Sequence, residues 1–302
     1  MDSLGQKVFV VLNPMAGQAN PAVIRSALAR YFAAPAWSCE IYETTGKEDV
    51  AQVVRQACEH GTGMVVAAGG DGTVAEVVNG LRHSRVPLGI LPVGTGNVLA
   101  HGLFLPLELE PALKLLAGDH VLMAVDALQV GSRYFLLNVS VGITSQTVRE
   151  MRPGQKRLWG IMAYVWTGTK HWIGFQPCRF ALMVDGRQRR IRASEILVSN
   201  GTLLKEPPLP IGPPETFSDG QLDVYIVTAR TMYDYIKVAW NLVFNPRNRK
   251  IRLRRLTARQ SITIDAGSRV LPVQADGDVI GETPVEIRLV PAAVRVVAPK
   301  PI

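Results

Sequence analysis

A glycine-rich turn at residues 69–73 carries the residues best suited to chemistry. It joins an apolar, strand-like run to a helical pattern in MVVAAGGDGTVAEVVNGL, and its members are Gly69, Gly70, Asp71, Gly72 and Thr73. The glycines let the backbone approach a polyphosphate, and the amides that begin the next helix attract anionic oxygens. Asp71 would repel phosphate without an intervening cation, so it predicts bound Mg2+. In the competing interpretation, Asp71 only caps the helix beginning near Thr73.

A second turn repeats this plan in LGILPVGTGNVLA at 88–100, with Gly94 and Thr95 between a strand-like run and a helix. Two such loops would flank one phosphate chain. The competing interpretation is an ordinary strand-to-helix connection with Asn97 as the N-cap. Asn13, which also follows a strand-like run, predicts a third loop at the same sheet edge.

The order of the elements predicts how these loops come together. From residue 7 to about 127, apolar strand-like runs alternate with helical patterns at 20–33, 47–60 and 73–82. This alternation predicts an α/β domain with a parallel sheet, whose ligands bind at the carboxyl ends of the strands. We expect this domain at 1–127, with 285–302 as a candidate for its completion, and a second domain at 128–284.

Shorter strand-like runs dominate the second domain, which predicts antiparallel strands in a β-sandwich. Helical patterns at 155–171 and 231–243 interrupt them, and PPLPIGPPE at 207–215 predicts a loop. The last run, VEIRLVPAAVRVVAP, predicts two more strands. Its period leaves open whether they join the second domain or return to the first.

Composition limits the classes of ligand and the cellular compartment that we expect for this chain. Hydrophobic residues make up 47% and charged residues 19%, which excludes a disordered chain, and the net charge of +8 favours anionic ligands. Three separated cysteines without a C-x-x-C pair indicate neither a disulfide framework nor zinc. We find no secretory signal pattern and no apolar run of about 20 residues. We therefore expect a cytoplasmic protein whose membrane contact, if any, is peripheral.

Three segments together resemble the nucleotide-site motifs of the diacylglycerol kinase-like lipid kinases, which include bacterial lipid kinases and sphingosine kinases. They are NPMAG at 13–17, GGDGTVAEVVNGL at 69–81 and PVGTGNVLA at 92–100. The similarity continues through LNVSVGI, FSDGQLDV and QADGDVIGETP, and so covers nearly the whole chain.

This resemblance implies a phosphofructokinase-like α/β nucleotide lobe, a β-sandwich lobe, and transfer of the ATP γ-phosphate to a lipid hydroxyl. It assigns catalysis and Mg2+ binding to Asp71. The residues that it implies for nucleotide binding are Asn13, Thr45, Gly69, Gly70, Gly72, Thr73, Gly94 and Thr95. From the sequence alone, Asn13 could equally start a turn and Thr45 could cap the helix at 47.

The resemblance assigns two further acidic residues in the second half. Asp278 stands where the family commonly has a glutamate that accepts the proton of the lipid hydroxyl, whereas its local sequence equally suits an Asp-Gly hairpin turn. Asp219 resembles a structural Mg2+ ligand of bacterial members, and a metal-free acidic turn is the alternative. Thr144 and Ser145 stand where several members have an acidic residue near the lipid headgroup, which leaves the acceptor open.

The arginines predict a partner of their own. Seven cations lie in 247–259, and a second cluster comprises Arg187, Arg189, Arg190 and Arg192. With the aromatic segment 159–175, these clusters favour peripheral contact with an anionic membrane, although solvated surfaces are the commoner outcome. No nucleic-acid motif is present, and a homodimer stays open. The rival functions are an NAD kinase-like enzyme and a noncatalytic protein that binds nucleotides or nucleic acid.

Overall fold

The computed structural model describes residues 6–150 except 18, 19, 34 and 36, then 177–201, 214–229, 231, 233, 234, 237 and 253–300. Two compact units divide the chain. The first comprises residues 1–125 and 292–302, and the second comprises 126–291. The predicted helices at 155–171 and 231–243, the loop at 207–213 and the cations at 247–252 lie wholly or mostly outside the described residues.

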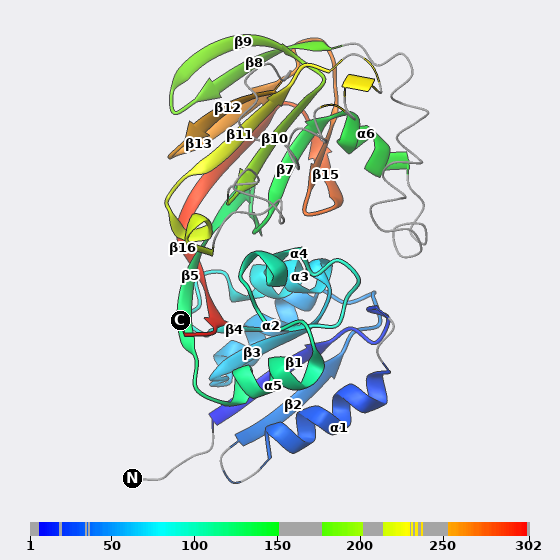
Figure 1. Cartoon of the computed structure of the whole chain (residues 1–302), viewed down its shortest axis with the longest axis vertical. Coiled ribbons are helices and arrows are strands. Elements are labelled where there is room, and N and C mark those ends of the chain that lie inside the picture. Colours follow the sequence, from blue (N-terminus) through cyan, green and yellow to red (C-terminus); the bar gives the residue numbers. More distant parts are fainter. Residues whose placement is uncertain are drawn as a thin grey trace. The chain divides into compact units, whose positions relative to one another are not determined.

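The first unit is built on a parallel sheet in the order β2-β1-β3-β4 (Figure 1). Its strands are β1 Gln6–Leu12, β2 Trp37–Glu43, β3 Met64–Gly69 and β4 Leu88–Pro92. Its helices are α1 Pro21–Tyr31, α2 Val50–Glu59, α3 Asp71–Leu81, α4 Val98–Gly102 and α5 Leu109–Ala117. β3 is buried along its whole length, as expected for a central strand with helices on both faces. The predicted parallel α/β architecture is confirmed.

Local signals fix where these helices begin. The Asn20 carboxamide accepts a hydrogen bond from the Ala22 amide at 2.9 Å, with Pro21 as the first helical residue of α1. The Asp49 carboxylate accepts one from the Gln52 amide at 3.0 Å and caps α2. The alternative in which Thr45 caps a helix at 47 is therefore wrong, because α2 begins three residues later with its own aspartate.

The second unit is a β-sandwich, as predicted. One antiparallel sheet has the order β12-β11-β10-β7-β14-β15, and the facing strands run β16-β13-β8-β9, with β5 paired to β16 and to β6. The bounds are β5 Val121–Val130, β6 Arg133–Phe135, β7 Asn138–Gly142, β8 Cys178–Val184, β9 Arg187–Ala193, β10 Glu195–Asn200, β11 Leu222–Val227, β12 Leu253–Ala258, β13 Ser261–Asp265, β14 Pro272–Ala275, β15 Asp278–Glu282 and β16 Val285–Ala298. Helix α6 (Ile143–Glu150) packs on β7 and β14, and a 3-10 turn spans Pro214–Ser218.

The core of the sandwich comes from alternate residues of both sheets. Val139, Ile196 and Val224 of one sheet join Leu182 and Ile262 of the other in one buried cluster. Strand alternation places the remaining residues of each strand on the opposite faces. The faces of the two sheets that are turned away from the core are therefore the ones that can contact a ligand or a partner.

The sequence left open whether the last strand-like run joins the second unit or returns to the first, and the structure shows that it does both. The chain forms one long strand, β16, rather than two. Its beginning pairs with β13 in the second unit, and Val296 near its end pairs with Leu88 of β4 in the first. Between these parts, Pro291 lacks an amide and Ala292 adopts a positive φ of 49°, so the backbone changes course without ending the strand.

Candidate functional site

Three loops of the first unit meet at the carboxyl edge of its parallel sheet. The Asn13 loop touches the 93–94 backbone so closely that a β-carbon on Gly17 would lie 2.0 Å from the Val93 carbonyl oxygen. The second and third loops are in contact as well, because a β-carbon on Gly94 would lie 2.4 Å from the Gly70 Cα. Real β-carbons do not approach other atoms this closely. Glycine is therefore required at positions 17 and 94 for the loops to converge.

A side-chain hydrogen bond joins the first loop to the second. The Asn13 carboxamide nitrogen donates to the Thr73 hydroxyl oxygen at 3.2 Å, and its oxygen accepts from the Met15 amide at 3.0 Å. Asn13 thus forms the turn that its sequence suggested and also holds Thr73, whose side chain is buried. The same hydroxyl lies over Gly69, where a β-carbon would come within 2.3 Å of it.

Asp71 binds the backbone of a neighbouring helix. Its two carboxylate oxygens accept hydrogen bonds from the amides of Val98 and Leu99, each at 3.1 Å. The competing interpretation, in which Asp71 only caps its own helix, is wrong. Instead, α3 begins after Gly70 and has no side-chain cap, whereas the Asp71 carboxylate caps α4.

The start of α3 and the Asp71 carboxylate both have hydrogen-bonding groups that suit a phosphate with its Mg2+. The first amides of an uncapped helix have no intrahelical acceptor, which suits them to an external anion. A carboxylate with one hydrogen bond on each oxygen keeps further acceptor positions. Mg2+ usually takes one or two carboxylates and fills its remaining sites with water and phosphate oxygens. Asp71 therefore fits the role of a Mg2+ ligand.

Asn97 shapes the third loop. It occupies the N-cap position of α4 in a left-handed conformation with φ of 47° but makes no capping hydrogen bond. Its carboxamide nitrogen donates to the carbonyl oxygens of Pro92 and Gly94, and its oxygen accepts from the Gly94 amide at 3.1 Å. These bonds close the turn around Thr95, which is left exposed.

Thr45 lies beyond the end of β2 and is also exposed. The preceding residue, Thr44, donates its amide to the Leu12 carbonyl oxygen at 2.9 Å, which places this turn beside the start of the Asn13 loop. The Thr45 amide is bound by the Glu48 carboxylate at 2.8 Å. Hydrogen bonds from the Glu48 backbone amide, and from Thr45 and Lys47, lower the pKa of Glu48 to about 2, so the carboxylate that shapes this turn is ionised at neutral pH.

In the second unit, Asp276 and Gly277 form a two-residue hairpin turn between β14 and β15. Both have positive φ, 46° and 91°, as a type I′ turn requires. The Asp276 carboxylate accepts hydrogen bonds from the amides of residues 136, 137 and 138 at 2.8–3.1 Å. Asp278 follows this turn as the exposed first residue of β15. The Asp-Gly turn is therefore real, and it leaves Asp278 outside it.

Asp219 lies among other carboxylates of the second unit. It accepts a hydrogen bond from the Gln221 amide, and partial burial, with Asp223 and Asp126 nearby, raises its pKa. Asp126 accepts from the Gly220 amide at 2.9 Å. Asn200 donates to the Asp126 carbonyl oxygen at 2.7 Å, but its own buried side-chain oxygen has no hydrogen-bond partner. The Asp223 carboxylate is already bound by the Arg255 guanidinium at 2.8 Å, whereas the partly buried Asp219 carboxylate beside it fits a bound cation.

Two protein families match successive parts of the chain. Residues 7–130 match the model of the diacylglycerol kinase catalytic domain, and residues 138–298 match the YegS C-terminal NAD kinase beta sandwich-like domain. The chain belongs to the diacylglycerol kinase-like family. A putative lipid kinase of Staphylococcus haemolyticus is 28% identical over 245 residues, 77% of this chain and 75% of the relative. A diacylglycerol kinase of Bacillus subtilis is 27% identical over 243 residues, 78% of each chain.

A solved structure supports the fold of this diacylglycerol kinase-like chain. The crystal structure of a putative diacylglycerol kinase from Bacillus anthracis superposes with a TM-score of 0.79 at 22% identity, covering 99% of this chain and 97% of that one. At this identity the likeness shows the fold alone. The family membership expected from the motifs is confirmed, and the chain is a lipid kinase by family.

Sequence reasoning missed a buried carboxyl group in this diacylglycerol kinase-like chain. Glu195 begins β10, and its carboxylate accepts hydrogen bonds from the amide and the hydroxyl of Thr144 at the start of α6. Burial raises the pKa of Glu195 to about 6, although these hydrogen bonds oppose the rise. Thr144 also contacts Ser140, which lies beside Gln274 of β14. The sequence signal was Glu195 itself, an acidic residue at the start of the otherwise apolar run EILV.

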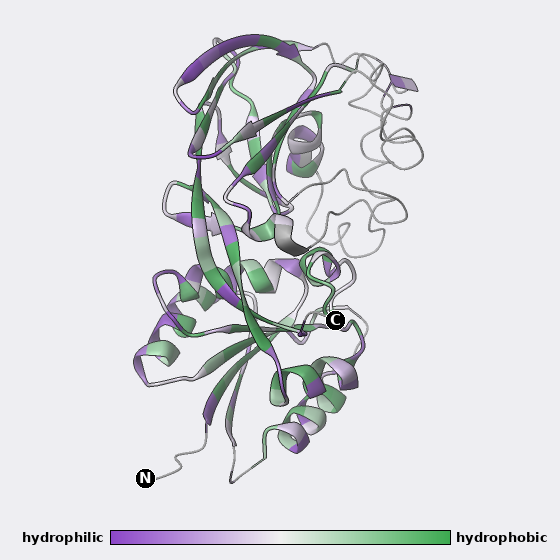
Figure 2. Cartoon of the chain, turned by 60° about the vertical axis from the view of Figure 1, so that its left-hand side comes forward, coloured by the Kyte–Doolittle hydropathy of each residue, from purple (hydrophilic) through white to green (hydrophobic). Residues whose placement is uncertain are grey.

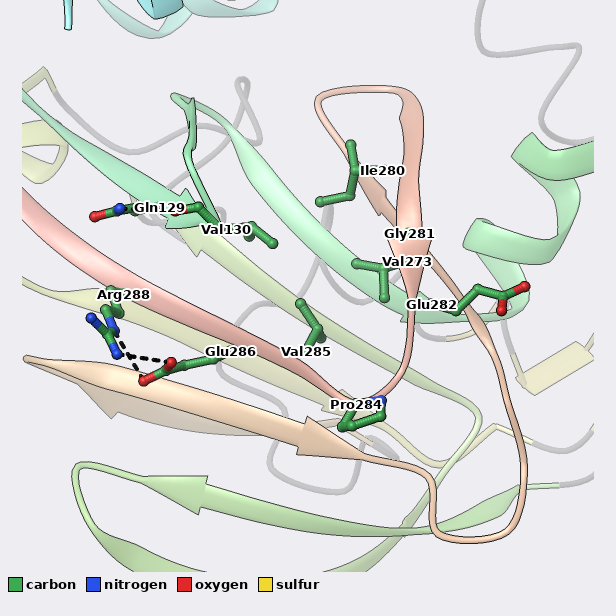
Figure 3. A pocket seen from close by; sticks show the side chains of 11 residues that line it. Gln129, Val130, Val273, Ile280, Gly281, Glu282, Pro284, Val285, Glu286 and Arg288 are labelled. Carbon is green, nitrogen blue, oxygen red and sulfur yellow. Dashed lines mark hydrogen bonds and ion pairs between the residues drawn. The ribbon is translucent and has the colours of Figure 1, made fainter.

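The second unit also contains a cavity of about 460 Å3 beside β15 and the start of β16 (Figure 3). Val130, Val273, Ile280 and Val285 supply its apolar lining. Its charged lining residues already have partners, because Glu286 binds Arg288 at 3.0 Å and Glu282 binds Arg149 at 3.0 Å. Because the charged side chains that line the cavity are already ion-paired, we assign this cavity no catalytic role.

Proposed function

We propose that this chain transfers the γ-phosphate of ATP to a hydroxyl group of a lipid. The observation that carries the proposal is the convergence of the three loops of the first unit, held by the Asn13–Thr73 hydrogen bond and the Gly70–Gly94 contact, beside the uncapped start of α3. Phosphoryl transfer depends on placing phosphates and neutralising their charge. The first unit offers backbone amides and a carboxylate for these tasks.

On this proposal, the nucleotide binds at Asn13, Thr45 and the two glycine turns, with Asp71 as the Mg2+ ligand. When bound, Mg2+ neutralises charge on the transferring phosphate. The exposed carboxylate of Asp278 accepts the proton of the lipid hydroxyl while the hydroxyl oxygen forms the bond to the γ-phosphorus. The bond from phosphorus to the bridging oxygen breaks, and ADP leaves. Because ATP is the donor, we expect the reaction in the cytoplasm.

A lipid extract incubated with labelled ATP and Mg2+ tests the activity. We expect label in an organic-soluble product, and chromatography of that product identifies the acceptor. NAD serves as the alternative acceptor, because the sandwich domain is of the NAD kinase-like type. Label in NADP and none in lipid would support the NAD kinase-like alternative. ATP binding without any transfer would support the noncatalytic one.

We further propose a structural divalent cation at Asp219. The support is the raised pKa of its carboxyl group beside Asp126 and Asp223, and the unpartnered oxygen of Asn200. Among the described residues no cluster of three acidic, histidine or cysteine side chains could hold a metal, so backbone carbonyls or water would complete the shell. Mg2+ should raise the melting temperature of the wild type more than that of Asp219→Asn, which keeps only the site proposed at Asp71. An equal response of both proteins would rule this site out.

A further inference from the structure

The hairpin of β8 and β9 carries a group of arginines that the proposed reaction does not use. β9 is the outermost strand of its sheet, and Figure 2 shows it as a strongly hydrophilic strand. The exposed members of this group are Arg179, Arg187, Arg189, Arg190 and Arg192. Within the described part of the chain, none of their side chains forms a hydrogen bond or an ion pair. The group therefore presents uncompensated positive charge.

The strand register puts three of these cations on one face. Phe180 and Leu182 of β8 point into the sandwich core, so Arg179 and its cross-strand partner Arg192 lie on the outer face, as does Arg190. Directly opposite residues have β-carbons only about 5 Å apart, and like charges there destabilise a sheet. The Arg179–Arg192 pair is therefore unfavourable unless an anion binds it.

The nearby acids do not pair with these arginines. Asp185, in the turn between the two strands, accepts hydrogen bonds from three backbone amides of residues 259–261. On the adjoining strand, Asp265 accepts from the Gly267 amide at 2.8 Å. Glu286, one strand further, binds Arg288. None of these three acids forms an ion pair with Arg179, Arg190 or Arg192, so the three guanidinium groups keep donors for an external partner.

Protection of a sheet edge does not explain the pattern. Charged residues on an edge strand discourage pairing with another chain, which could account for β9. Arg179, however, lies on β8, which is paired on both sides, with β13 and with β9. Met183 lies on the same outer face and is 47% exposed, so the face also offers an apolar side chain.

We propose that the outer face of the β8–β9 hairpin docks on the anionic surface of a lipid bilayer. The inference deepens the proposed function and rests on it in one respect, because a lipid acceptor lies in a membrane. A row of guanidinium groups on a flat sheet faces many phosphates at once, and each group binds phosphate through paired donors. Each arginine is expected to contribute roughly fivefold to binding, so three contribute about 100-fold.

Cosedimentation of the full chain with vesicles tests the docking surface. We compare phosphatidylcholine vesicles with and without phosphatidylglycerol, at low and high salt. The variant Arg179→Gln/Arg190→Gln/Arg192→Gln should bind anionic vesicles about 100-fold more weakly than the wild type. The control, Arg85→Gln/Arg133→Gln/Arg295→Gln, removes three exposed arginines from other places and changes the net charge equally, from +8 to +5. It should bind within about threefold of the wild type.

Measurements of stability and of activity separate loss of the docking surface from misfolding of the variant and from failure of the proposed function. Arg192→Gln should raise the melting temperature, because it relieves the repulsion with Arg179, while it weakens vesicle binding. The hairpin variant should phosphorylate a detergent-dispersed acceptor at the wild-type rate and a vesicle-borne acceptor more slowly. If the wild type phosphorylates no lipid in either form, the proposed function fails, but the binding comparison still decides the docking surface.

Three outcomes would overturn the inference. Equal loss of binding in the two triple variants would show that only net charge matters. Undiminished binding by the hairpin variant would place the contact elsewhere. If the wild type bound a single-stranded oligonucleotide tightly through these arginines but did not bind anionic vesicles, the surface would be a nucleic-acid site.

Discussion

Gly94 lies so close to Gly70 that a β-carbon on Gly94 would stand 2.4 Å from the Gly70 Cα. This contact joins the two glycine turns, and it makes Gly94→Ala an informative substitution. We expect it to destabilise the fold by about 1–3 kcal/mol and to weaken ATP binding, because the two turns must move apart. Gly72→Ala is the control for stability alone, since its β-carbon would meet nothing within 4 Å and alanine favours the helix. Chemical denaturation and nucleotide titration check both, and equal stability of the two variants would contradict the contact.

Asp71→Asn should separate the two tasks of this carboxylate. The variant loses one acceptor and the negative charge at the start of α4, which should cost about 1–2 kcal/mol of stability. If Asp71 also holds Mg2+ against phosphate, turnover should fall by far more than this loss explains. Thermal denaturation and kcat measured on the same preparation check the difference. Near-normal turnover in the folded variant would leave Asp71 with a purely structural task.

The two aspartates of the β14–β15 hairpin should behave oppositely when changed to asparagine. Asp278→Asn should change stability less than Asp276→Asn does, because the side chain is exposed, but lower the rate of lipid phosphorylation by roughly 10²- to 10⁴-fold. Asp276→Asn should destabilise the fold by about 1–3 kcal/mol, because three backbone amides depend on its oxygens. Asp278→Glu keeps a carboxylate and should retain substantial activity.

The contrast between the two residues also decides where a base could be. Asp276 would be the alternative base if Asp278→Asn were fully active, but its engaged carboxylate makes it a poor proton acceptor. Rates with ATP and lipid, and unfolding midpoints in urea, give the two readouts. A wild-type rate in Asp278→Asn would remove Asp278 from the reaction.

Glu195 should make stability depend on pH in the mildly acidic range. Burial raises its folded-state pKa to about 6, above its ordinary value of 4.5, so the folded state binds the proton more tightly than the unfolded chain. Its ionisation therefore weakens folding as the pH rises from 4.5 to 6, by up to about 2 kcal/mol. Above pH 6 the penalty stays constant.

Glu195→Gln isolates this effect from the other carboxyl groups. Urea denaturation of both proteins at pH 5 and pH 7.5 gives the change in unfolding free energy across the range. The wild type should lose more stability than Glu195→Gln between these pH values. Identical changes would mean that Glu195 is not protonated in the folded protein at pH 5.

The sequence by itself determined the parallel strands of the first unit, most of its helices and the glycine turns at which its loops converge. Apolar periodicity and glycine positions are local properties, and parallel strands bring their carboxyl ends to one edge whatever the details. Asn13, Gly70 and Gly94 could therefore be placed together before the fold was known. The cap of α2 was misplaced, because Thr45 and Asp49 are both good capping residues and period alone does not choose between them.

Only the tertiary structure decided which partners the key side chains have. Asp71 binds amides 27 and 28 residues away, and Asp276 binds amides about 140 residues away, pairings that no local pattern encodes. Burial of Glu195 depends on α6 packing over β7 and β14. The course of β16 was likewise undecidable from its period, because an alternating strand suits either sheet and only hydrogen bonding to β13 and then to β4 selects both.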